Sequence, residues 1–114
     1  MQRHVQGGDM PAIIQIITTI NDRERAEKIG RRLVEEKLVA CCQITGPIRS
    51  IYRWKGGIEE ADEWYVIIKT KRSLYNQVEG TIRRLHPYEV PEIIAIPICD
   101  AFDDYTTWVK RETL

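Results

Sequence analysis

The order in which β-branched segments and amphipathic segments alternate constrains this fold more than any other feature of the sequence. Residues 12–19 form a short run rich in isoleucine and threonine, which is typical of a strand. Further strands are predicted at 39–44, resuming at 48–54 after an interruption at Gly46-Pro47, and at 64–68 and 93–98. Helices are predicted from Asp22 to about Lys37, from a capping Ser73 to residue 85, and from Asp103 onward. The predicted order is therefore βαββαβ with a terminal helix.

This order is that of an α+β, ferredoxin-like sandwich, in which both helices lie on one face of an antiparallel sheet. Lys55-Gly56-Gly57 can reverse the chain between the second and third strands, because glycine accepts a positive φ. The two strands should then form a long β-hairpin. Pro97 cannot donate to a ladder, so the last strand should lie at a sheet edge or carry a bulge. We expect a single domain, residues 12–114, after a disordered lead-in, residues 1–11.

Two of the predicted strands are apolar on both faces. Isoleucines occupy 13, 14, 16 and 17 in the first, and 93, 94, 96 and 98 in the last. Two helices can cover only one face of the sheet, so something else must cover the other. The sequence therefore predicts a homo-oligomer whose open sheet faces pack together.

Charge and cysteine usage exclude several classes of protein. Lys+Arg and Asp+Glu both number 17, and this balance disfavours a nucleic-acid binder, which needs basic surface. No apolar run approaches the roughly 20 residues that span a bilayer. The polar first eleven residues do not resemble a secretory signal, and the three cysteines (41, 42 and 99) lack metal-finger spacing. We expect reduced thiols and a cytoplasmic location.

The segment HPYEVPE, residues 86–92, has two interpretations. As a joint, Pro87 ends a helix and Pro91 holds the next strand's entry extended. As a site, His86 binds a metal ion with a partner from the second strand, such as Cys41 or Cys42, or with one from a neighbouring subunit. Cys41 and Cys42 are adjacent on a strand, so they point to opposite faces and cannot both bind one ion. The residues favour the joint. The sequence shows no recognisable arrangement of a nucleophile and a base, so we do not predict an enzyme.

Aromatic residues on the hairpin suggest a second type of site. Large aromatic side chains on a protruding hairpin more often bury themselves against a partner than stay exposed. A ligand cleft between subunits would bring hairpin residues together with the 86–92 loop. Its predicted members are Tyr52, Trp54, Lys69, Tyr88 and Glu92. The acidic return arm of the hairpin, residues 59–63, is interpreted as a solvated surface.

Several motifs in order across the chain resemble the CutA family of divalent-cation tolerance proteins, from about residue 12 to 108. The motifs are LVAC (38–41), SIYRWKG (50–56), IIKT (67–70) and HPYEVPE (86–92). The resemblance implies a ferredoxin-like subunit in a tight homotrimer, similar in architecture to PII signalling proteins. It also implies a link to copper and other divalent cations.

The chain departs from the family's copper-binding members at two positions. Such relatives can carry a cysteine where this chain has Thr18, and a second histidine where it has Leu85. His86 is the one direct match. The leading hypothesis is a cytosolic homotrimer, not an enzyme, linked to divalent metal (copper) tolerance, with His86 and Cys41 as candidate ligands of Cu(II) or another divalent cation. The alternatives are a PII-like sensor of a small metabolite or anion, and a trimeric interaction scaffold.

Overall fold

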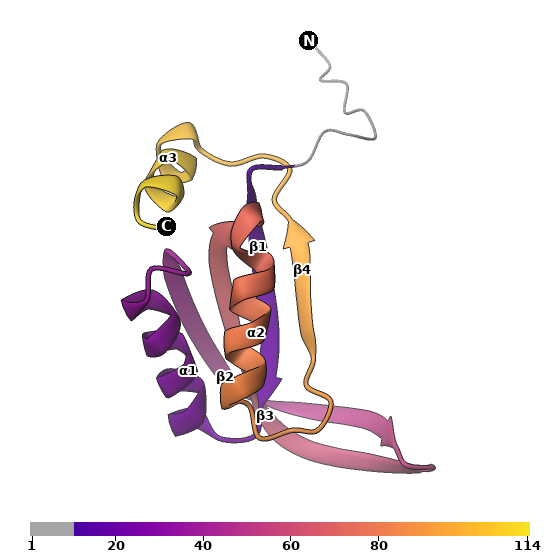
Figure 1. The fold of residues 1–114 in the computed structure, drawn as a ribbon. Coiled ribbons are helices and arrows are strands. Elements are labelled where there is room, and N and C mark those ends of the chain that lie inside the picture. The colour runs from indigo at the N-terminus through magenta and orange to yellow at the C-terminus, as the bar shows by residue number, and fades with distance from the viewer. Residues whose placement is uncertain (1–10) are drawn as a thin grey trace.

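The computed structural model describes residues 11–114 and has the predicted ferredoxin-like order (Figure 1). Its strands form one antiparallel sheet in the order β2-β3-β1-β4, so the Pro97 strand lies at an edge as predicted. Apart from Pro11, the predicted lead-in lies outside the described residues. The elements are β1 (Ile13–Ile20), α1 (Arg23–Glu35), β2 (Cys41–Trp54), β3 (Gly57–Lys71), a 3-10 turn (Arg72–Leu74), α2 (Tyr75–Leu85), β4 (Ile93–Pro97) and α3 (Asp103–Arg111).

The core lies between α1, α2 and one face of the sheet. Alternate residues of β1 point into it, because side chains of a strand alternate between the two faces. The helices supply residues spaced three or four apart, which share one helical face. The main members, all at most 1% exposed, are Ile14, Ile16, Ile20, Ala26, Ile29, Leu33, Val66, Ile68, Val78 and Ile82.

The helix α1 approaches the sheet most closely at Gly30. A Cβ atom placed there would lie 2.5 Å from Sγ of Cys42, which is shorter than any normal contact. Cys42 therefore points to the helix side of β2. Its neighbour Cys41 points to the opposite side, with Sγ 3.6 Å from the Tyr105 hydroxyl of α3. The two cysteines lie on opposite faces, as predicted.

The second face of the sheet is covered at one end by the terminal helix. α3 packs there through Val109, which is fully buried, and the Leu114 amide donates to the Lys37 carbonyl (3.0 Å). At the rest of this face Ile94 and Ile96 stay 46% and 43% exposed. The sequence correctly predicted apolar residues on both faces, but it did not predict that the chain's own last helix covers part of the second one.

The long hairpin has the predicted geometry and projects beyond the sheet (Figure 1). Lys55 and Gly56 both have positive φ (49° and 82°), which fits a two-residue turn between β2 and β3. The register shifts between Thr45 and Ile48, at the predicted interruption. Helix α1 also begins as predicted, with the Asp22 side chain accepting from the amides of Glu24 and Arg25.

Two local predictions were wrong. Ser73 does not cap α2, because the 3-10 turn takes up residues 72–74 and Leu74 precedes the helix with no side-chain cap. Helix α1 ends at Glu35 rather than Lys37, whose φ of 59° turns the chain toward β2. Helix α2 ends at Leu85 as predicted, and this residue is 38% exposed because the chain leaves the helix there. Within residues 11–114, no helix has both the length and the hydropathy to cross a bilayer.

Candidate functional site

A cleft of about 720 Å³ lies between the hairpin and the 86–92 loop. Four of the five predicted cleft residues line it: Tyr52, Trp54, Tyr88 and Glu92. The fifth, Lys69, does not line this cleft within the protomer. Its Nζ donates to Oε1 of Gln43 (2.6 Å), at the part of β3 that pairs with Cys41.

The 86–92 loop, which forms one side of this cleft, begins where α2 ends. Pro87 follows His86, whose φ and ψ of −85° and 135° are extended, so the helix stops there. The His86 amide still donates to the Ile82 carbonyl (2.8 Å). The joint interpretation of the segment therefore agrees with the structure, and the loop that follows runs beside the hairpin (Figure 1).

The His86 ring makes hydrogen bonds through both nitrogens. The Tyr88 amide donates to Nδ1 (3.2 Å), and Nε2 lies 2.8 Å from the carbonyl oxygen of Thr19. A backbone amide can only donate, so Nδ1 is the acceptor and Nε2 carries the proton that is donated to Thr19. The ring is 8% exposed. Burial lowers the pKa of His86, while the Thr19 hydrogen bond and the charge of Glu63 oppose this change.

Glu63 is the functional candidate that sequence reasoning missed. It was read as part of a solvated acidic arm, yet its side chain lines the cleft and the residue is 5% exposed. The Tyr88 hydroxyl donates to Oε2 of Glu63 (2.6 Å). Burial, followed by this hydrogen bond, raises the pKa of Tyr88 above its usual range. Among the ion pairs of residues 11–114, none involves Glu63.

Other charged residues around the cleft have partners nearby. Arg49 lies 3.5 Å from Glu60 and 3.1 Å from Asp62. Glu89 lies 3.8 Å from the Lys55 ammonium, at the hairpin tip. All of these side chains are more than half exposed, so each pair contributes little to stability. The other charged groups that line the cleft are Glu63, Glu92 and Arg53.

The structure does not bring the predicted metal ligands together within one protomer. Cys41 pairs with Lys69 on β3, whereas Thr19, which holds His86, pairs with Tyr65. These positions on β3 are four residues apart, which is about 13 Å along a strand. Residues 11–114 contain no group of three or more His, Cys, Asp or Glu side chains placed to hold a metal ion.

The three thiols lie outside the cleft. Cys41 contacts Tyr105, and burial with this hydrogen bond raises the pKa of Tyr105 to about 12. Cys42 lies on the helix side of the sheet, where burial raises the pKa of its thiol to about 11. Cys99 lies beyond β4 and is exposed.

The two positions that depart from copper-binding relatives also lie outside the cleft. Thr18 is fully buried on the helix side of β1, and its Oγ1 has no hydrogen-bond partner in the described part of the chain. Leu85 occupies the last residue of α2.

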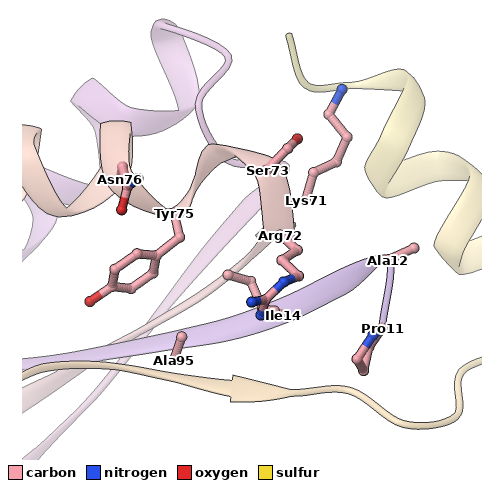
Figure 2. Close-up of a pocket in the computed structure, with 9 residues that line it drawn as sticks. All are labelled: Pro11, Ala12, Ile14, Lys71, Arg72, Ser73, Tyr75, Asn76 and Ala95. Carbon is pink, nitrogen blue, oxygen red and sulfur yellow. The ribbon is translucent and has the colours of Figure 1, made fainter. Parts of the chain in front are cut away.

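A second cavity, of about 760 Å³, lies where β1, β4 and the start of α2 meet (Figure 2). Lys71, Arg72 and Ser73 contribute to its lining. Figure 2 shows Arg72 and Tyr75 extending over the strands, while Lys71 and Ser73 point away from them. Arg72 and Ser73 are exposed, and no charged residue of the lining is buried. This arrangement is a charged strand end.

Comparison with known proteins is consistent across the chain. The model of the family described as CutA1 divalent ion tolerance protein matches residues 14–112. The divalent-cation tolerance protein CutA of Pyrococcus horikoshii is 41% identical over 101 residues, covering 89% of this chain and 98% of that protein. The chloroplastic protein CutA of Arabidopsis thaliana is 38% identical over 104 residues, or 91% of this chain, and the match spans 57% of its length.

The fold agrees with solved structures of the same family. The crystal structure of CutA1 from Shewanella sp. SIB1 superposes with a TM-score of 0.89 at 39% identity, covering 92% of this chain and 98% of that one. Family model, relatives and structure thus agree over nearly all described residues. The chain belongs to the CutA1 family of divalent ion tolerance proteins.

Proposed function

We propose that this protein supports divalent-cation tolerance as a non-catalytic homotrimer that binds a divalent cation in the cleft beside Glu63. The single observation that carries the proposal is the carboxyl group of Glu63, which is 5% exposed and has a phenol, but no cationic side chain of residues 11–114, as its partner. A buried carboxylate without a balancing charge is costly, and a bound cation supplies that charge. The same carboxylate argues against an anionic ligand at this position.

A neighbouring protomer completes the site in this proposal. One protomer provides too few ligands, because no group of three acidic, histidine or cysteine side chains converges in residues 11–114. The open sheet face continues from β4 toward the cleft, and its exposed Ile94 and Ile96 need a cover. A second copy packed on this face would also reach the cleft. Thiols that form no disulfide fit a reducing compartment, and we place the protein in the cytoplasm on that ground.

Equilibrium dialysis of the whole chain against a panel of Mg(II), Mn(II), Cu(II) and Zn(II), with metal quantified by mass spectrometry, tests the cation site. Glu63→Gln should reduce binding at least tenfold. Glu59→Gln is the matched control, because it makes the same chemical change at an exposed position four residues away on the same strand, outside the cleft. Equal binding by wild type and Glu63→Gln would refute the site.

Light scattering on protein that elutes from a size-exclusion column tests the proposed homotrimer. A mass of three protomers is expected at micromolar concentration, and Ile94→Asp should lower it by placing a charge on the covered face. A monomeric mass for the wild type would refute the homotrimer.

A further inference from the structure

We draw no further inference here: the strongest candidate, the hydrogen-bonded cluster of His86, Tyr88 and Glu63 where the 86–92 loop meets the hairpin, belongs to the site already described.

Discussion

The hydrogen bond between Tyr88 and Glu63 should be one of the strongest side-chain contributions to the stability of this protein. Tyr88→Phe deletes the hydroxyl that lies 2.6 Å from Oε2 of Glu63 and changes nothing else in the ring. A hydrogen bond to a charged group contributes about 1.5–3 kcal/mol, against about 1 kcal/mol for a neutral pair. Glu63 is 5% exposed, so water cannot easily replace the lost donor. We expect Tyr88→Phe to lower the free energy of unfolding by about 2 kcal/mol.

A double-mutant cycle isolates this contribution. In a Glu63→Gln background the acceptor is neutral, so Tyr88→Phe should cost about 1 kcal/mol, which leaves a coupling free energy of about 1 kcal/mol. Guanidinium unfolding at pH 7.5 measures the free energy of unfolding of each variant, at one fixed protomer concentration because the proposed assembly would contribute to stability. Tyr52→Phe makes the same change at another tyrosine of the cleft, 42% exposed, and should be nearly neutral. Equal costs of Tyr88→Phe in both backgrounds would refute the reasoning.

Three further predictions concern packing, pH and thiol reactivity. Gly30→Ala should lower the free energy of unfolding by about 1 kcal/mol, because overpacking against Sγ of Cys42 outweighs the better helix propensity of alanine. In a Cys42→Ala background, chemical unfolding should show a smaller loss. Because the pKa of His86 is lowered in the folded protein, the His86 imidazole binds a proton more readily in the unfolded chain. The free energy of unfolding should therefore fall as the pH drops below about 6.5. Between pH 7.5 and 5.5 this fall should be smaller in His86→Gln. Iodoacetamide at pH 8 should label exposed Cys99 well before Cys42, whose pKa is about 11; faster modification of Cys42 by mass spectrometry would contradict this.

The order of elements could be predicted from the sequence because each signal is local. Asp22 caps a helix whose apolar residues recur at helical spacing, and Pro87 stops the next one, whatever the rest of the chain does. The Lys55-Gly56 turn is likewise set by two residues. The failed cap at Ser73 is also local in origin. A 3-10 turn, in which the Tyr75 amide donates to the Arg72 carbonyl, stands where the cap was predicted, and the sequence does not distinguish the two. Such errors move a boundary and leave the fold unchanged.

The position of Glu63 could not be predicted in this way, because its burial depends on three segments that meet only in the folded chain. Four acidic residues between 59 and 63 look alike in the sequence, and most of this arm extends past the sheet into solvent. Ile20, the last residue of β1, pairs with Trp64 of β3, so Glu63 lies just beyond the end of this pairing. The 86–92 loop returns to the same point, because His86 is bonded to Thr19. The Tyr88 hydroxyl then donates to Oε2 of Glu63. Shifting the β1–β3 register by one residue would turn Glu63 to the helix side, so the cleft depends on strand pairing as much as on the loop that borders it.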